Sequence, residues 1–337
     1  MTENTGPSAE LHRDVENALK LLDDLRLQLP EMLHEHRSHD VGFRKRSYKR
    51  WKAGLDKLKM FIVVSQELGS AFNELGRPRA VAEQNYKFEA TVALHARSVR
   101  VANEILALLR EGFPDGALSR WRTLHELAVV TTFLTNNDKE VSKRFIAHRA
   151  IANAKALKQY VKFLPRSNMT PLEPGVLNAA EATRTALLSE FGQEFDEDMG
   201  WAFPVIAKPK RINLYDLEVA TGLDHWRPRF RWASDDIHAG PKPYHASLGM
   251  VETPIGKPLL LVGRSNSGFT DPAHMCVISL NLTNHALPEE YRTDDERMIL
   301  VALRILSDEL GETFLEIDRE TGKRSARAVS ADEERPA

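Results

Sequence analysis

Two stretches of the sequence place an arginine and a histidine close together on predicted helices. In RWASDDIHAGPK (residues 231–242), Arg231 and His238 are seven positions apart. On a helix predicted over residues 226–239 they lie two turns apart and about 20° apart in projection, with Ser234 between them. Histidine transfers protons near neutral pH and arginine stabilises negative charge. The pattern therefore predicts metal-independent acid–base chemistry on an anionic substrate.

The end of this predicted helix strengthens the hypothesis. Gly240 and Pro241 follow directly, which places the His238 imidazole at a helix C-terminus, where the dipole favours its protonated form. An apolar stripe on the other side is predicted to face the core: Trp226, Phe230, Ala233 and Ile237. The alternative is a solvated polar face on which Arg231 pairs with Asp235, because most charged helix faces are simply surface.

The second stretch is SRWRTLHELAVV (residues 119–130), on a helix with apolar residues nearly all round, which predicts burial. Arg122 and His125 are one turn apart, and Glu126 lies one turn beyond Arg122. A buried arginine needs a partner, so the structural alternative is an Arg122–Glu126 pair with His125 as a hydrogen-bonded core histidine. If the two helices pack together, a site is predicted from Arg122, His125, Glu126, Arg231, Ser234 and His238.

Helical periodicity dominates the elements that must position these residues. Residues 9–36 predict an amphipathic helix disturbed at Pro30, and the helical pattern resumes over 53–75 and stops near Pro78. Further helices are predicted over 80–112, 115–136, 139–163, 176–192, 213–221, 271–286 and 293–317. The fold class is therefore all-α: a multi-helix bundle (residues 79–317) with an N-terminal helical arm (1–78) and a disordered tail (318–337). One Gly/Pro-rich loop is expected to hold a small β-hairpin.

Composition narrows the class of protein. The 337 residues are 42% hydrophobic and 28% charged, with a formal net charge of −2, which gives no overall electrostatic case for binding nucleic acid or membranes. Neither a signal peptide nor an apolar run of transmembrane length is present, so a cytoplasmic protein is predicted. The single cysteine, Cys276, excludes an intramolecular disulfide and lies in an apolar run typical of the core.

A local basic segment stands out against this neutral background. FRKRSYKRWK (residues 43–52) interleaves aromatic residues with cations that could contact phosphates, namely Arg44, Lys45, Arg46, Lys49 and Arg50. The alternative is a solvated helix segment whose aromatic residues pack inward. The nearby His34, His36 and His39 do not share a helical face, so no metal site is predicted. Glycine-rich nucleotide motifs are absent, and no cofactor is predicted.

Both Arg–His stretches lie in segments that resemble a known family. NEILALLREGFPDGALSRWRTLHELAVV (103–130) and FRWASDDIHAGPK (230–242) are similar to the hallmark segments of a bacterial family of helical proteins of unknown function. The resemblance covers most of residues 80–317, and it implies a helical fold without implying an activity.

A more distant resemblance is to the HEPN superfamily of small helical bundles, whose signature is Arg-x(4–6)-His. Arg120 with His125 and Arg231 with His238 match this spacing, although Trp121 and Trp232 stand where the superfamily usually has a polar residue. The resemblance implies metal-independent RNA cleavage through the 2′-hydroxyl, at a site built from paired protomers or repeats. It assigns His238 as the acid–base group and Arg231 as the charge stabiliser, with His125 and Arg120 or Arg122 completing the cluster.

Two functions therefore stay open at this point. The first is a metal-independent endoribonuclease effector in defence or stress response, with RNA as its partner. The second is a non-catalytic helical protein that binds a protein partner or a small ligand, with the Arg/His cluster serving as a structural network. A homo-oligomer is predicted in either case, because the apolar area of several long helices often finds a symmetric mate.

Overall fold

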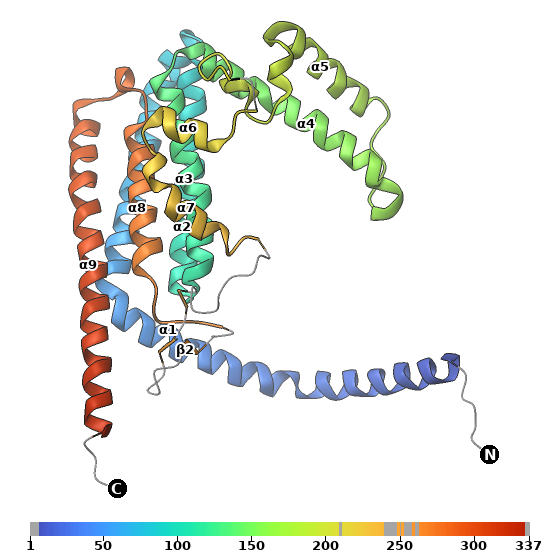
Figure 1. Cartoon of the computed structure of the whole chain (residues 1–337), viewed down its shortest axis with the longest axis vertical. Helices are drawn as coiled ribbons and strands as arrows, with labels where there is room; N and C mark the ends of the chain where they lie inside the picture. Colours follow the sequence, from blue (N-terminus) through green and yellow to red (C-terminus); the bar gives the residue numbers. More distant parts are fainter. Residues whose placement is uncertain are drawn as a thin grey trace. The chain divides into compact units, whose positions relative to one another are not determined.

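The computed structural model describes residues 7–208, 211–238, 248–249, 251–252, 258–259 and 263–333, with side chains over 11–208, 211–238, 248–249 and 263–321. Helices account for nearly all of the regular structure in these ranges, which confirms the all-α, multi-helix class (Figure 1). The chain divides into two units, Met1–Arg50 and Trp51–Ala337. This division comes from contacts within the structure and does not show which segments fold independently. The predicted domain boundary after residue 78 therefore stays a prediction.

The first helix, α1 (Pro7–Ala82), runs through both prolines at which the sequence predicts a break or an end. Pro30 and Pro78 are both exposed to solvent. A proline inside a helix leaves the carbonyl four residues earlier without its hydrogen bond, and at an exposed position water can supply that bond. The predicted stop near Pro78 is therefore wrong, since α1 ends at Ala82, and the pattern over 9–36 and 53–75 belongs to one long helix.

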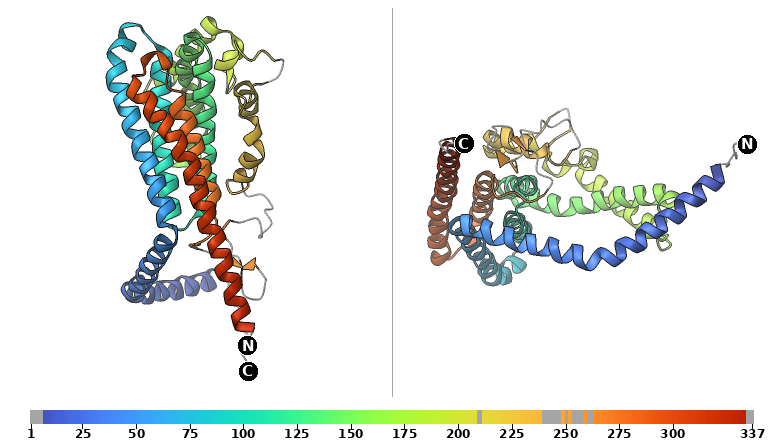
Figure 2. Two further views of the ribbon diagram at one scale, coloured as in Figure 1. Left: turned by 90° about the vertical axis from the view of Figure 1, so that its left-hand side faces the viewer. Right: turned by 90° about the horizontal axis from the view of Figure 1, so that it is seen from below.

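The second unit is a helical bundle. The part of α1 after Arg50 contacts α2 (Tyr86–Arg110), α8 (Thr270–His285) and α9 (Asp294–Glu333), and α3 (Pro114–Asn136) packs in turn on α2 and α8 (Figure 2). Trp51 at the start of this part is fully buried, and its ring stacks on Phe269 and Phe314 with centroids 5.0 and 5.6 Å away. These aromatic contacts join α1, α8 and α9 into one core.

Two glycines of α1 permit this close packing. A Cβ atom at Gly54 would lie 2.7 Å from the Phe314 ring, and one at Gly69 would lie 2.3 Å from the His95 ring of α2. Both distances are far below van der Waals contact. The missing side chains therefore let α9 and α2 approach the backbone of α1.

A helical hairpin extends from the bundle (Figure 1). It consists of α4 (Lys139–Ser167) and α5 (Val176–Phe191), followed by the short helices η1 (Gln193–Asp196) and η2 (Gly200–Ala202). Arg144 of α4 is buried and donates long hydrogen bonds of 3.4 Å to the carbonyls of Phe191 and Gly200, while its guanidinium stacks on Phe191 and Phe195. The arginine thus satisfies the carbonyl end of α5 and fixes the hairpin to the segment that follows.

Three short helices then cover α3: α6 (Leu214–Thr221), η3 (Asp224–Trp226) and α7 (Arg227–Ser234). The start of α6 is set by a capping box, in which the Asn213 side chain accepts from a backbone amide and the Asp216 side chain accepts from the Asn213 amide. Gly222, at φ +71°, ends α6 in the left-handed conformation that glycine adopts without strain. These local signals position α6 and α7 beside the second Arg–His stretch.

The last part of the chain contains two short strands, the short helix η5 and the end of α9. β1 (Val251–Glu252) pairs antiparallel with β2 (Pro258–Leu259), and Val251 lies opposite Leu259. Residues 253–257 lie outside the described residues, so the β-hairpin in the Gly/Pro-rich loop stays a prediction. After η5 (Glu289–Tyr291), α9 continues to Glu333 and so enters the segment predicted to be a disordered tail. That segment is rich in Arg, Glu and Ala, which favour a helix locally without tertiary contacts.

Candidate functional site

The histidine of the α3 stretch lies in the core. His125 is 1% exposed, and its ring packs between Trp121 and Phe230, with centroids 5.4 and 5.6 Å away. Its Nε2 donates a 3.0 Å hydrogen bond to Oε1 of Glu218, a fully buried carboxylate on α6. The other carboxylate oxygen, Oε2, accepts a 3.0 Å bond from Nη1 of Arg227 on α7. A three-residue network, in which His125 and Glu218 are buried and Arg227 is half-buried, therefore ties α3 to α6 and α7.

This network changes the partners that the sequence predicts. The structural alternative paired Arg122 with Glu126, but no such ion pair occurs among the described residues. Glu126 is half-buried on α3 and does not form the predicted ion pair with Arg122. The carboxylate that satisfies His125 is Glu218, which sequence reasoning missed, and the cation beside it is Arg227. The one available signal was an acid in the apolar helix LYDLEVAT, and it is weak because such acids are usually exposed.

Arg122 has an unusual environment next to this network. Its guanidinium lies over the Phe230 ring at 4.6 Å from the centroid, and Arg227 approaches the same ring at 5.0 Å. Nε of Arg122 is buried and lacks a hydrogen-bond partner in the part of the chain that the structure describes. Cation–π contact compensates only part of the lost hydration. Two cations thus share one aromatic ring, and only Arg227 has a carboxylate partner among the described side chains.

Among the described residues, Arg120, the arginine that has the HEPN-type spacing to His125, does not contact the His125–Glu218–Arg227 network. It pairs with Glu104 of α2, and its Nη1 donates to the Thr123 hydroxyl at 3.2 Å. An arginine already bound to a carboxylate is poorly placed to stabilise a second anion, so Arg122 is the better candidate from this stretch.

The opening stretch, RWASDDIH, ends its helix earlier than predicted. α7 stops at Ser234, whose hydroxyl donates to the Phe230 carbonyl at 2.7 Å. Asp235 and Asp236 follow, and acidic residues are unfavourable at a helix C-terminus. The expected continuous helix to residue 239 is therefore wrong. Backbone amides of Ile237 and His238 still bond the Ser234 carbonyl, at 3.0 and 3.2 Å, as a closing turn.

The two faces of α7 differ sharply in exposure. Phe230 and Ala233 are buried as predicted, and Trp226 is half-buried, whereas Ile237 is 45% exposed because it lies beyond the helix. On the outer face Arg231 and His238 are exposed, and Trp232 is 62% exposed. Gly240 and Pro241 lie outside the described residues.

The six residues predicted to converge therefore separate into two groups. Arg122 and His125 meet α6 and α7 through Glu218, Arg227 and Phe230, in the interior. Arg231 and His238 lie on the exposed side of α7, and Ser234 is half-buried between the two groups. In the described contacts no bond links one group to the other. The interior group is bonded within the packed helices, and Arg231 and His238 are exposed to solvent.

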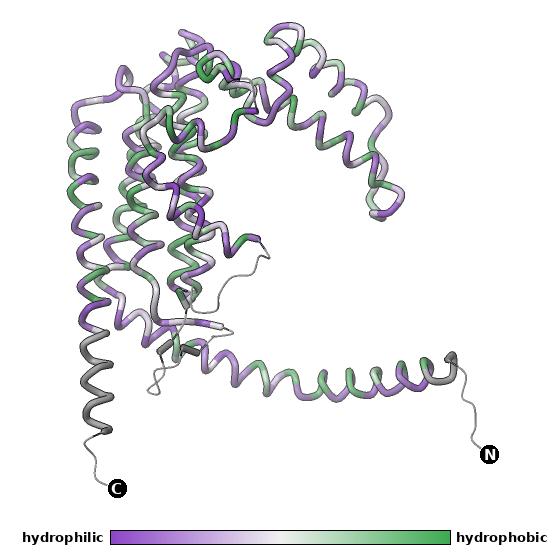
Figure 3. Tube along the Cα trace, in the orientation of Figure 1, coloured by the Kyte–Doolittle hydropathy of each residue, from purple (hydrophilic) through white to green (hydrophobic). Residues whose placement is uncertain are grey.

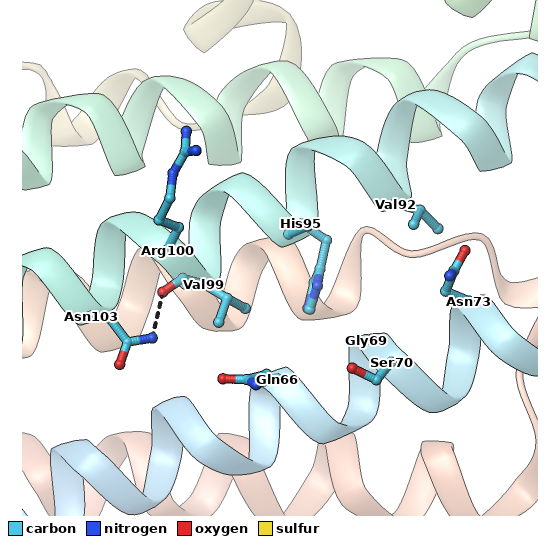
Figure 4. A pocket seen from close by; sticks show the side chains of 10 residues that line it. Gln66, Gly69, Ser70, Asn73, Val92, His95, Val99, Arg100 and Asn103 are labelled. Atoms are coloured by element: carbon cyan, nitrogen blue, oxygen red, sulfur yellow. Dashed lines mark hydrogen bonds between the residues drawn. The ribbon is translucent and has the colours of Figure 1, made fainter.

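A second candidate site is a groove of about 450 Å³ between α1 and α2 (Figure 4). His95 lies at its base and bonds Asn284 Oδ1 through Nε2 at 2.8 Å, while Asn284 donates to the Ser65 hydroxyl at 2.8 Å. Burial lowers the pKa of His95 below its usual value. The polar rim includes Gln66 and Arg100, which are exposed.

The predicted basic segment lies on α1 in the first unit. Arg44, Lys45, Arg46 and Lys49 are exposed there, and Arg50 is half-buried. Nucleic-acid contact by these residues stays a prediction. The described residues contain no group of three His, Cys, Asp or Glu side chains arranged to bind a metal ion. None of the described helices combines the length and the apolar character that crossing a membrane requires.

Comparison with known proteins gives one match. Residues 88–253 match a family described as a family of unknown function (DUF5677). The matched range begins in α2, ends one residue after β1 and includes both Arg–His stretches, which supports the predicted resemblance to a helical family without an assigned activity. No curated protein and no solved structure matches the chain. The function must therefore be argued from the site itself.

Proposed function

We propose that the chain binds RNA on the exposed face of α7, and that the His125–Glu218–Arg227 network holds this face in place. The observation that carries the proposal is Trp232, 62% exposed and next to the exposed Arg231 on a helix whose other face is anchored in the core. An exposed indole beside a cation offers a flat surface on which a base can stack.

Neighbouring side chains support the same ligand class. Single-stranded nucleic acid is bound by aromatic rings that stack on bases and by cations that contact phosphates. Tyr215 of α6 is 45% exposed, and the Arg227 guanidinium lies 5.6 Å from its ring centroid. Together with Trp232 and Arg231, this gives two exposed aromatic rings and one exposed cation on α6 and α7, while Arg227, bound to Glu218, positions the Tyr215 ring.

RNA cleavage is a second candidate function, favoured by the exposure of His238. His125 is buried and its Nε2 is bonded to Glu218, so it is unsuited to act on a substrate. His238 is accessible, and Arg231 lies in the same exposed segment. In this reaction His238 would take the 2′-hydroxyl proton, and the 2′-oxygen would attack phosphorus as the bond to the 5′-oxygen breaks. The 5′-oxygen would take a proton from water, which gives a 2′,3′-cyclic phosphate and a 5′-hydroxyl end. The HEPN resemblance implies that a second protomer supplies the other histidine and arginine.

Fluorescence anisotropy with a labelled single-stranded RNA, in EDTA, tests the binding proposal. Trp232→Ala is expected to weaken binding by about 5- to 150-fold, because one stacked base contributes roughly 1–3 kcal/mol. Arg231→Gln is expected to weaken it less. Arg229→Gln is the matched control, since Arg229 is on the same helix but pairs with Asp271 at 3.1 Å, and it should change binding less than twofold. Equal effects of all three substitutions would refute a specific role for this face.

Denaturing gels on the same samples separate binding from cleavage. Loss of cleavage in a folded His238→Ala variant that still binds RNA would establish the catalytic candidate. Intact RNA after incubation with the wild-type protein would leave binding alone. If the wild-type protein does not bind RNA at all, the alternative function, a protein-partner or small-ligand binder with a structural Arg/His cluster, replaces the proposal.

A further inference from the structure

The first unit leaves an unusual amount of apolar surface exposed. Along residues 11–32 of α1, eight aliphatic side chains and one methionine are between 41% and 80% exposed: Leu11, Val15, Leu19, Leu21, Leu22, Leu25, Leu27, Leu29 and Met32. Figure 3 shows these apolar positions recurring between hydrophilic ones along the helix. Isolated helices are only marginally stable in water, so a helix with this surface needs a partner.

The spacing of these residues identifies a seam. Seven apolar positions follow one another at alternating steps of four and three: Leu11, Val15, Ala18, Leu22, Leu25, Leu29 and Met32. Their mean spacing of 3.5 residues is the heptad repeat of a coiled coil rather than the 3.6 of a straight amphipathic helix. Val15, Leu22 and Leu29 take the a positions of this repeat, and Leu11, Ala18, Leu25 and Met32 take the d positions. Leu27 falls outside the seam, at the outward f position.

We propose that residues 11–32 pair with the same segment of a second copy of this chain as a parallel, in-register, two-stranded coiled coil. This pairing is independent of RNA binding. In-register packing places each apolar seam residue against its own copy, so neither strand buries a charge. At 1.5 Å per residue the segment spans about 33 Å. A seam of that length buries on the order of 600 Å² per partner, which reaches the lower size limit of stable interfaces.

The residues flanking the seam are compatible with this arrangement. In a parallel pair, each g position faces the e position five residues later on the partner. The facing pairs are Asp14 with Leu19, Leu21 with Arg26, and Gln28 with Leu33. None of these pairs brings like charges together, and Leu19, Leu21 and Leu33 widen the apolar contact. A second copy thus fits the face along its whole length.

Sedimentation velocity on the full chain tests the proposal. The wild-type protein should sediment with twice the 38.1 kDa chain mass. Leu22→Asp should weaken the dimer about 100-fold or more, because it places an unpaired charge from each strand at the centre of the seam. Leu27→Asp is the matched control, with the same substitution on the same helix at the outward position, and it should leave the dimer intact.

Tryptophan emission reports whether the bundle is folded, and a cysteine in the seam reports the orientation of the two strands. All five tryptophans lie at residue 51 or later, so unchanged tryptophan emission in Leu22→Asp would confirm that the bundle is folded. Val15→Cys then tests the orientation: mild oxidation should join two chains, since parallel, in-register a positions face each other. The native Cys276 is fully buried, and burial raises the pKa of its thiol, so it will not compete.

Several results would overturn the proposal. A wild-type protein that is monomeric at tens of micromolar would exclude self-pairing through this seam. Equal dissociation by Leu22→Asp and Leu27→Asp would show that the heptad assignment is wrong. A dimer that Leu22→Asp dissociates but that Val15→Cys does not cross-link would refute the parallel register.

Discussion

His125 and His238 have the same kind of sequence neighbourhood but opposite environments. Each follows an arginine at the spacing of one Arg–His stretch, yet His125 is 1% exposed and bonded to a buried carboxylate, whereas His238 is exposed beyond the end of α7. The Arg-x(4–6)-His spacing therefore occurs both at a buried, hydrogen-bonded histidine and at an exposed one. Burial and partners, rather than spacing, decide which role a histidine can have.

Truncating the two histidines should give the largest contrast. His125→Ala is expected to lower the free energy of unfolding by about 3 kcal/mol, because it leaves a cavity and removes the donor bonded to the buried Glu218. His238→Ala should leave the urea midpoint unchanged. Urea unfolding followed by circular dichroism measures both. Similar losses in the two variants would erase the distinction between a structural and an accessible histidine.

Removing the charge of Glu218 should have the next largest effect. Glu218→Gln keeps an acceptor for His125 but leaves Arg227 without its carboxylate, and a loss of about 2 kcal/mol in unfolding free energy is expected. The control is Glu126→Gln, an acid on α3 that the sequence placed in the cluster but that is only half-buried. The control should lose less than a quarter as much, and a larger loss there would mean that Glu126 has a structural role.

A third histidine sharpens the comparison through pH. Burial lowers the pKa of His95 in the folded protein. Below about pH 6.5 the His95 imidazole of the unfolded chain therefore binds a proton, while that of the folded protein stays neutral. Stability should therefore fall as the pH is lowered from 7.5 to 5.5. His95→Gln should show a smaller fall in urea midpoint over this interval. Some pH dependence should persist, because burial also lowers the pKa of His148 and His274.

The smallest expected effect concerns the exposed face of α7. If Arg231 contacts one phosphate, Arg231→Gln should reduce the slope of log Kd against log salt concentration by about one. Arg229→Gln, with its guanidinium already paired to Asp271, should leave the slope unchanged. Anisotropy titrations at several salt concentrations measure both slopes. An unchanged slope in Arg231→Gln would remove this arginine from the RNA contact.

The sequence by itself determined the helical class and most helix positions. The apolar periodicity predicted α3 and α8 closely: the expected ranges 115–136 and 271–286 differ by at most one residue at either end from Pro114–Asn136 and Thr270–His285. The core placement of Phe230 and Ala233 followed from the same periodicity, because a helix must bury its apolar stripe. The predicted stop near Pro78 failed because a proline removes only one helix hydrogen bond, and at an exposed position water can bond the carbonyl that is left.

Only the tertiary structure decided which polar residues meet. Glu218 is 93 positions from His125 in the sequence, and an acid in the apolar helix LYDLEVAT is only a weak indication that it will be the buried partner. Arg122 and Arg227 meet on one phenylalanine ring because α7 packs across α3, and Arg231 and His238 stay outside because the acidic residues after Ser234 end the helix. Periodicity reports which face of an element is buried, but contacts between distant elements depend on how those faces pack.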